Sequence, residues 1–315
     1  MIHIINLLCG IGVFLFGISI MSDSVEAAFG DRLKNLLATV TKTRFSSVLT
    51  GTFTTGAIQS SAATTVMTVS FVDSGLMTTK QAAGVVMGAN IGTTVTSLLI
   101  AFNFSSISPL FIFFGALAKL FCKSKTKQSI GMLSVGFGLL FLGMNTMSGS
   151  FAHLKDNPAF LSMISASQGR LAGIISGFIM TAVMQSSSAT VGILQALAQQ
   201  GIVSIDSALY IVFGQNIGAV VPTLLSIAGK NKAAKSVGVL HLIFNIAGTL
   251  IFSVITLLVP LTDILRKIPS SEMQVSVAHI LFNVASTVII LPFTDLMVRV
   301  CERLSGVKAI KISTS

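Results

Sequence analysis

The sequence Gln59-Ser60-Ser61-Ala62-Ala63-Thr64 is a polar interruption in apolar surroundings, and it has a second copy that begins 126 positions later, at Gln185. The second copy reads Gln185-Ser186-Ser187-Ser188-Ala189-Thr190. The same offset, without a gap, relates Gly88-Ala89-Asn90-Ile91-Gly92 to Gly214-Gln215-Asn216-Ile217-Gly218. Because the correspondence runs from about residue 6 to about residue 102, it indicates a duplicated half-molecule and not a short solenoid unit.

Composition places the chain among membrane proteins. Hydrophobic residues make up 52% and charged residues 10%, with a mean hydropathy of +0.89, which is far too little charge for a soluble domain of 315 residues. A cleaved signal peptide is not indicated, because Met1 to Ser22 has no basic first region and later segments are equally apolar. The net charge of +10 does not favour nucleic-acid binding, since the basic residues cluster in short loops between apolar runs.

Seven apolar runs are long enough to cross about 30 Å of hydrocarbon. They cover residues 5–22, 81–101, 107–122, 130–148, 208–228, 237–260 and 275–297. The two stretches that contain the repeated motif, 45–72 and 171–198, are ambiguous by length alone. Each fits either one long span or two half-helices that turn back.

Loop charges favour the second of these arrangements. Loop lysines tend to lie in the cytoplasm, so the lysine-rich loops at 123–127 and 230–235 should share a side, with an even number of crossings between them. Two predicted spans already lie between these loops, so residues 171–198 must enter and leave on the same face. The same parity applies to residues 45–72. Both stretches are therefore predicted to be re-entrant hairpins with arms of about 13 residues, or about 20 Å.

Three crossings separate the starts of the two copies, so the two halves should have opposite orientations, as in many secondary transporters. We expect an all-α polytopic membrane protein of inverted structural repeats, with the amino terminus outside and the carboxyl terminus in the cytoplasm. Residues 1–129 form the first repeat and residues 130–260 the second, each with one span, one hairpin and two further spans. Residues 261–315 add a carboxyl-terminal span and a cytoplasmic tail.

The hairpin tips suit an anion. A new half-helix begins just after each glutamine, so the serines are natural N-caps and the positive end of the helix faces the tip. A single QSS tripeptide would be explained better by helix packing, but its duplication favours a binding site. The predicted oxyanion cradle consists of Gln59, Ser60, Ser61, Gln185, Ser186, Ser187 and Ser188.

The repeated glycine and asparagine cluster has two explanations. It provides close helix packing, or it unwinds a helix so that carbonyl groups, Asn90 and Thr93 coordinate a cation. All ten acidic residues fall near predicted span ends or in loops, so we expect no carboxylate at the centre. Because proton-coupled transport usually needs an ionisable group there, coupling to a hard monovalent cation held by neutral oxygens is the better expectation.

Two histidines lie inside predicted spans. His241 with Asn245, and His279 with Asn283, form i, i+4 pairs on helix faces. Such a histidine either relays protons or, more commonly, forms a hydrogen-bond clamp between helices. No serine lies in a nucleophile-elbow pattern, and no histidine or lysine adjoins the QSS serines, so an intramembrane enzyme is not expected.

QSSAAT with GANIGTT, QSSSAT with GQNIG, and the later HLIFN and HILFN resemble the type II sodium/phosphate cotransporter family in its short bacterial form. The resemblance covers essentially the whole chain. It implies sodium-driven phosphate transport in the cell membrane, with phosphate at the seven cradle residues, sodium as the coupling ion and no other cofactor. By position it assigns sodium, or the groups around it, to Thr64, Asn90, Thr93, Thr94, Thr190, Gln215 and Asn216.

The chain also departs from the family pattern. In the second copy Ala219, Val220 and Pro222 replace Thr93, Thr94 and Thr96, which removes hydroxyl groups from one expected sodium position. Leu242 and Ile280 stand where electrogenic animal members carry aspartate, so electroneutral coupling is expected. The alternatives are a transporter of another oxyanion, such as sulfate or arsenate, an anion channel, and an intramembrane enzyme. The expected partners are phosphate, sodium and lipid, without nucleic acid; a homodimer is compatible with the sequence.

Overall fold

The computed structural model describes residues 2–155, 157–165 and 169–307, so the tail at 308–315 lies outside the described residues. In the described part of the chain, all regular structure is helical. This confirms the prediction of an all-α polytopic membrane protein. Helical segments that are long and apolar enough to cross a membrane cover residues 2–40, 79–101, 125–154, 205–226, 232–258 and 271–304.

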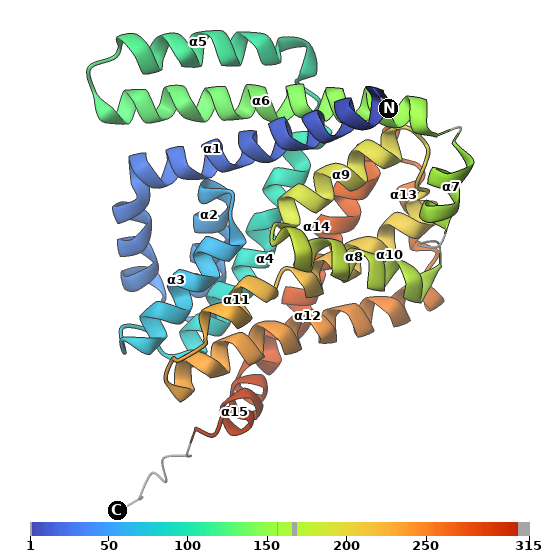
Figure 1. Ribbon diagram of the computed structural model, residues 1–315. Coiled ribbons are helices and arrows are strands. Elements are labelled where there is room, and N and C mark those ends of the chain that lie inside the picture. Colours follow the sequence, from blue (N-terminus) through green and yellow to red (C-terminus); the bar gives the residue numbers. More distant parts are fainter. Residues whose placement is uncertain (1, 156, 166–168, 308–315) are drawn as a thin grey trace, which may run out of the picture.

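Every predicted span coincides with helical structure, but the helices differ from the predicted spans in length and, at 208–228, the helix is interrupted. Helix α5 (Ser108–Phe121) follows the 3-10 turn η1 (Ser105–Ile107) and has 14 residues, or about 21 Å, so it is a shorter apolar helix and not a seventh full-length span. Helix α1 (Ile2–Val40) continues far beyond the predicted end at residue 22. Figure 1 shows its second half turning away from the direction of the first.

Each motif stretch is a pair of short helices that is interrupted at the glutamine and the following serine. Helices α2 (Arg44–Ile58) and α3 (Ser61–Asp73) flank the first break, and α8 (Arg170–Met184) and α9 (Ser187–Gln199) flank the second. The arms have 15 and 13 residues in both pairs, close to the predicted length. The predicted helix, break and second helix are therefore present in both halves.

Glycines allow the first arm of each hairpin to contact closely the helix that comes after the hairpin in the sequence. A Cβ atom on Gly88 of α4 (Thr79–Ala101) would lie 2.0 Å from the carbonyl oxygen of Val48. At the corresponding place in α10 (Ile205–Gly218), a Cβ on Gly214 would lie 1.9 Å from the carbonyl oxygen of Ile174. Because α4 stays helical through its glycine and asparagine cluster, the packing explanation holds there and unwinding is wrong.

Helix α6 (Lys125–Leu154) packs along α1 in the opposite direction, and the contacts are reciprocal. Gly10 lies against Met147 and Gly143, and Gly136 lies against Met21 and Gly17. The 126-residue offset relates Gly10 to Gly136, Met147 to Met21, and Gly143 to Gly17. A two-fold axis between two antiparallel helices produces this pattern, which is the relation that inverted repeats require.

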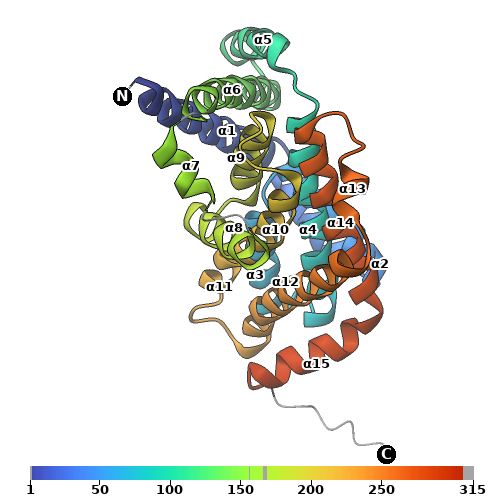
Figure 2. The same cartoon turned by 90° about the vertical axis from the view of Figure 1, so that its right-hand side faces the viewer.

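A second pair of helices also packs antiparallel, so that residue numbers rise along one helix as they fall along the other. Gly248 of α12 (Lys232–Leu258) lies beside Ser286 of α14 (Ser271–Ile290), and the ring of Phe252 lies 5.2 Å from that of Phe282. Helix α5 instead lies against α6 at one edge of the molecule (Figures 1 and 2). These contacts pair α12 with α14 in the core and leave α5 at the edge.

The remaining elements are shorter than the helices described above. They are α7 (Pro158–Ser165), α11 (Val221–Ser226), α13 (Leu261–Leu265), the 3-10 turn η2 (Leu291–Phe293) and the terminal helix α15 (Thr294–Leu304). The exact boundaries of the two repeats and the side on which each terminus lies stay predictions.

Candidate functional site

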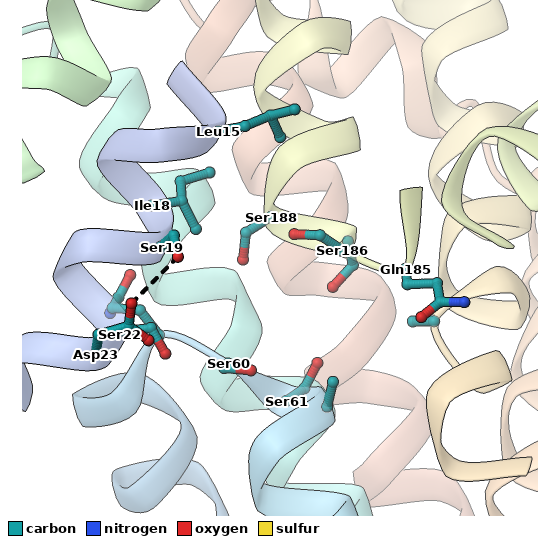
Figure 3. Close-up of a pocket in the computed structure, with 14 residues that line it drawn as sticks. Leu15, Ile18, Ser19, Ser22, Asp23, Ser60, Ser61, Gln185, Ser186 and Ser188 are labelled. Carbon is teal, nitrogen blue, oxygen red and sulfur yellow. Dashed lines mark hydrogen bonds between the residues drawn. The ribbon is translucent and has the colours of Figure 1, made fainter. Parts of the chain in front are cut away.

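Both hairpin tips open into one cavity of about 260 Å³. All seven residues of the predicted oxyanion cradle line it, namely Gln59, Ser60, Ser61, Gln185, Ser186, Ser187 and Ser188. Helix α1 forms a third wall, which no sequence pattern indicated, with Leu15, Ile18, Ser19, Ser22 and Asp23. Figure 3 shows α1 facing the two tips. The structure thus brings together residues from three parts of the chain, while their role in binding stays a prediction.

The two glutamines give the tips the same unusual backbone. Gln59 has φ 61° and Gln185 has φ 52°, in the left-handed region that residues with a Cβ atom rarely adopt. The N–H of Gln59 donates to the carbonyl of Thr55, and the N–H of Gln185 donates to the carbonyl of Thr181, both at 2.7 Å. Each glutamine therefore ends one helix and redirects the chain so that the next helix starts two residues later.

The next residue at each tip is the predicted serine N-cap. Ser60 is extended, and its Oγ accepts a hydrogen bond from the N–H of Ala63 at 3.1 Å. Ser186 has the same conformation and accepts from the N–H of Ala189 at 3.2 Å. The first N–H groups of a helix have no acceptor within the helix, and its positive end attracts anions. Two such helix ends therefore point into one cavity.

Thr96 of α4 connects the two tips, a contact that the sequence does not predict. Its Oγ1 donates to Oε1 of Gln59 at 2.7 Å and accepts from Oγ of Ser188 at 3.3 Å. The side-chain amide of Gln59 also donates to the carbonyl of Gly56. Gln59 is therefore buried and fixed in place. The 126-residue offset does single out Thr96, because proline replaces it in the second copy, but the offset alone does not show what Thr96 contacts.

The second tip differs because Pro222 occupies the position that corresponds to Thr96. Proline lacks an N–H and its ring clashes with the carbonyl four residues earlier, so it disfavours continuation of the helix. That earlier residue is Gly218, where α10 ends before the chain restarts as α11. Gln185 is exposed, and Figure 3 shows it across the cavity from α1. The two chemically equivalent glutamines thus have different surroundings.

The residues that the resemblance assigns to sodium do not line this cavity. Thr64, Thr93 and Thr94 are buried, and each hydroxyl donates to a carbonyl of its own helix or cap. Asn90 and Asn216 likewise donate to carbonyls one turn earlier, and Thr190 does the same through its hydroxyl. Gln215 is buried, and neither polar atom of its side chain has a partner among the described residues. The sodium assignment stays a prediction.

Asp23 corrects the expectation that no carboxylate lies at the centre. The apolar run ends at residue 22, which suggested the end of a span, but α1 is one helix from Ile2 to Val40 and Asp23 lies near its middle. Oδ2 of Asp23 accepts a hydrogen bond from Oγ of Ser19 at 3.3 Å. Among the residues that the structure describes, Asp23 is the one ionisable side chain on the cavity lining.

His241 forms the hydrogen-bond clamp that was the more common explanation for it. Its Nδ1 lies 2.9 Å from Oγ1 of Thr223, and its Nε2 lies 3.3 Å from Nδ2 of Asn90. These contacts join α12 to α11 and α4. His279 differs, because its buried Nδ1 has no partner among the described residues. The clamp prediction is therefore confirmed for His241 alone.

Comparison with known proteins identifies relatives over most of the chain. Residues 13–149 and 154–270 match the model of the Na+/Pi-cotransporter family. The chain is 28% identical over 307 residues to the putative inorganic phosphate export protein YjbB of Salmonella typhimurium, covering 96% of this chain and 56% of that protein.

The protein of the same name in Escherichia coli K12 is 28% identical over 305 residues, with the same two coverages. An uncharacterized protein of Bacillus subtilis, YqeW, is 26% identical over 299 residues, covering 94% of this chain and 96% of that protein. The chain spans about half the length of the YjbB relatives. No solved structure matches the chain significantly.

Proposed function

The chain belongs to the Na+/Pi-cotransporter family, and from this premise we propose that it is a secondary transporter that moves inorganic phosphate together with sodium. The observation that carries the proposal is that two serine-capped helix N-termini, one from each hairpin, line a single cavity. The YjbB relatives, whose name describes phosphate export, support phosphate as the substrate. Transport, and not catalysis, is the function that this arrangement suits.

The cavity lining fits a tetrahedral oxyanion. Serine hydroxyls, backbone N–H groups and the amide of Gln185 offer hydrogen-bond donors from several directions. A cavity of about 260 Å³ has room for a phosphate with attached water. Neutral donors of this kind bind an anion without forming a fixed salt bridge, so the ion can also be released.

Charge balance favours cotransport of a cation. Each helix N-terminus acts as roughly half an elementary positive charge, so two of them supply about +1. No basic side chain lines the cavity in the described part of the chain, and Asp23 adds a negative charge. A phosphate dianion would therefore leave the site with a net charge of about −2 by this count. Sodium ions that bind with phosphate would reduce that charge.

The arrangement of the halves supports alternating access as the proposed mechanism. The reciprocal contact of α1 with α6 and the matched helix crossings are consistent with inverted repeats, which exchange conformations when the cavity opens to the other side. An inward sodium gradient drives phosphate inward in this scheme, whereas the name of the YjbB relatives describes export. Measured flux must therefore decide the direction.

The test is uptake of radiolabelled phosphate by proteoliposomes that contain the whole chain. An inward sodium gradient is compared with an equal potassium gradient, and valinomycin sets the voltage. We expect accumulation with sodium only, inhibition by unlabelled phosphate, and little effect of voltage if coupling is electroneutral. Stronger inhibition by sulfate than by phosphate would reassign the substrate. Large ionic currents without accumulation would indicate a channel, and no sodium-dependent uptake by folded protein would refute the proposal.

A further inference from the structure

We propose that the carboxylate of Asp23 holds a sodium ion beside the bound phosphate, in a coupling site that α1 adds to the two hairpin tips. The inference rests on the proposed function and names a residue to which neither the family resemblance nor the relatives assign a role. Asp23 lines the same cavity as the serines of both tips. Figure 3 shows it on α1, where the dashed line joins it to Ser19.

The groups around Asp23 have the chemistry that a hard cation needs. Ser19 and Ser22 lie on the same wall of the cavity, and Ser19 is within hydrogen-bond distance of the carboxylate. Hard cations are bound by carboxylate, hydroxyl, carbonyl and water oxygens. One carboxylate and two hydroxyl groups on successive turns of a helix thus supply part of a coordination shell, and phosphate oxygens and water supply the rest.

Charge supplies the second argument. Among the described residues, no lysine or arginine forms an ion pair with Asp23 and no basic side chain lines the cavity. A bound phosphate would therefore share the cavity with an uncompensated carboxylate, and like charges within one cavity repel each other. A cation between them converts the repulsion into two attractions. Phosphate binding then depends on sodium binding, which is the coupling that a symporter requires.

The second half of the molecule has no equivalent of this site. The 126-residue offset places Ser148 and Gly149 of α6 opposite Ser22 and Asp23. Gly149 has no side chain, and Oγ of Ser148 donates to Oε1 of Gln199 at 2.5 Å. The phosphate cradle is thus built from both halves, whereas the charged cation site is built from one. A sodium ion is favoured over a proton here because the serine hydroxyls add neutral oxygen ligands that proton binding does not need.

The test compares Asp23→Asn with Glu26→Gln, which removes the same charge three residues further along α1. Both side chains are exposed, but Glu26 lies outside the lining of this cavity. Phosphate uptake is measured against sodium concentration at saturating phosphate. We expect Asp23→Asn to raise the half-saturating sodium concentration at least tenfold and to lower the Hill coefficient. Glu26→Gln should stay within twofold of wild type. Unchanged sodium dependence in Asp23→Asn would overturn the proposal.

A second measurement needs no transport. Thermal unfolding of the purified protein in detergent is followed with sodium or potassium, without phosphate. We expect sodium to raise the melting temperature of wild type and of Glu26→Gln, and this shift to be lost in Asp23→Asn. Wild type that shows the sodium shift but transports no phosphate would refute the proposed function and leave the cation site standing. A shift that persists in Asp23→Asn would refute the cation site.

Two further variants test the proposal if Asp23→Asn does not fold, or if Asp23 binds a proton in place of sodium. If Asp23→Asn does not fold, Ser22→Ala tests the same wall, with an expected increase of threefold or more in half-saturating sodium; no increase would overturn the proposal. Asp23→Glu keeps the carboxylate and should restore sodium dependence in part. If uptake in wild type instead follows an inward proton gradient without sodium, and Asp23→Asn abolishes that dependence, then Asp23 carries a proton and the sodium assignment is wrong.

Discussion

The two hairpin tips have nearly identical backbones and different surroundings. Ser60 has φ −141° and ψ 104°, Ser186 has φ −143° and ψ 106°, and a left-handed glutamine precedes each. Gln59 is 8% exposed and hydrogen-bonded to Thr96, whereas Gln185 is exposed, and proline occupies the position that corresponds to Thr96 in the second copy. The comparison teaches that duplication preserved the element that presents N–H groups to the cavity, and that the groups around this element have diverged.

The helices that begin at the two tips, α3 and α9, also differ in how much of each is buried. All residues of α9 from Ser187 to Ala198 are buried, whereas α3 buries only a minority of its residues, including Thr64, Thr68 and Val72. The second arm of the second hairpin thus lies in the core and that of the first lies partly at its edge. The first arms show the opposite, with seven buried residues in α2 and three in α8. In alternating access, two inverted repeats exchange conformations, so their surroundings are expected to differ in any single state. Four predictions below test which features the two halves share and which they do not.

The largest expected effect concerns the shared helix crossings. Gly88→Ala and Gly214→Ala each place a Cβ about 2 Å from a backbone oxygen, so the helices must separate. We expect each to lower the free energy of unfolding by about 3 kcal/mol or more, seen as loss of folded protein in size-exclusion chromatography. Gly149→Ala is the control, because a Cβ there meets nothing within 4 Å. Tolerance of one substitution and not the other would show that the crossings are not equivalent.

The next effect concerns the shared N-caps. Ser60→Ala and Ser186→Ala remove the hydroxyl that caps α3 or α9 and lines the cavity. Loss of an N-cap costs about 1 kcal/mol, while loss of a donor to phosphate should reduce uptake at least tenfold in both variants. Ser70→Ala in α3, where the exposed hydroxyl only bonds to its own helix, should stay within twofold of wild type. Uptake that depends on one cap alone would indicate a site at a single tip.

A smaller effect should separate the two halves. Gln59→Ala leaves the buried hydroxyl of Thr96 without its acceptor, so it should lower the free energy of unfolding by about 1–3 kcal/mol. Gln185→Ala removes an exposed side chain and should change stability by less than about 0.5 kcal/mol while still impairing transport. Thermal unfolding of both variants in detergent measures the difference. Equal destabilisation would contradict the described asymmetry.

The smallest effect is at the ends of the two hairpins. Asp73, at the end of α3, accepts a hydrogen bond from the N–H of Asn231 at 3.0 Å and pairs with Lys230 at 3.1 Å. The Asn231 N–H and then Lys230 lower the pKa of Asp73 below its ordinary value of 3.8. Its counterpart in the second half is the neutral Gln199.

The lowered pKa determines how this contact depends on pH. Asp73 stabilises the fold above pH 3.8, and the stabilisation is lost as the pH falls through the lower folded-state pKa. Asp73→Asn should therefore lower the melting temperature slightly at neutral pH and by less in acid, because such surface pairs contribute little. Gln199→Glu adds a charge where no pairing cation is expected and serves as the contrast. A larger loss for Asp73→Asn in acid than at neutral pH would contradict the described pairing.

The sequence alone predicts the features that depend on local patterns. Apolar runs locate the helices, loop lysines indicate the two hairpins, and the serine after each glutamine marks an N-cap. Features that depend on tertiary contacts could not be predicted. The apolar run of the first span ends before Asp23, yet the helix continues, so the only acid on the described cavity lining was placed at a span end. Likewise, the bond between Thr96 and Gln59 joins residues on different helices, which no spacing rule connects.

The length of α5 shows a related limit. Its composition predicted a seventh span, because the run at 107–122 is apolar except for Ser108 and Lys119. Its helix has 14 residues and packs on α6 outside the paired core helices. High hydropathy indicates that a segment is apolar, but it does not show whether that segment crosses the membrane completely.

The most direct test of the central claim, that both tips hold one anion, is an experimental structure of the protein with arsenate, located by the anomalous scattering of arsenic. The account predicts one arsenic peak between Ser60 and Ser186, with oxygens in hydrogen-bond distance of both helix N-termini. A peak at one tip only, or at another place in the molecule, would contradict it.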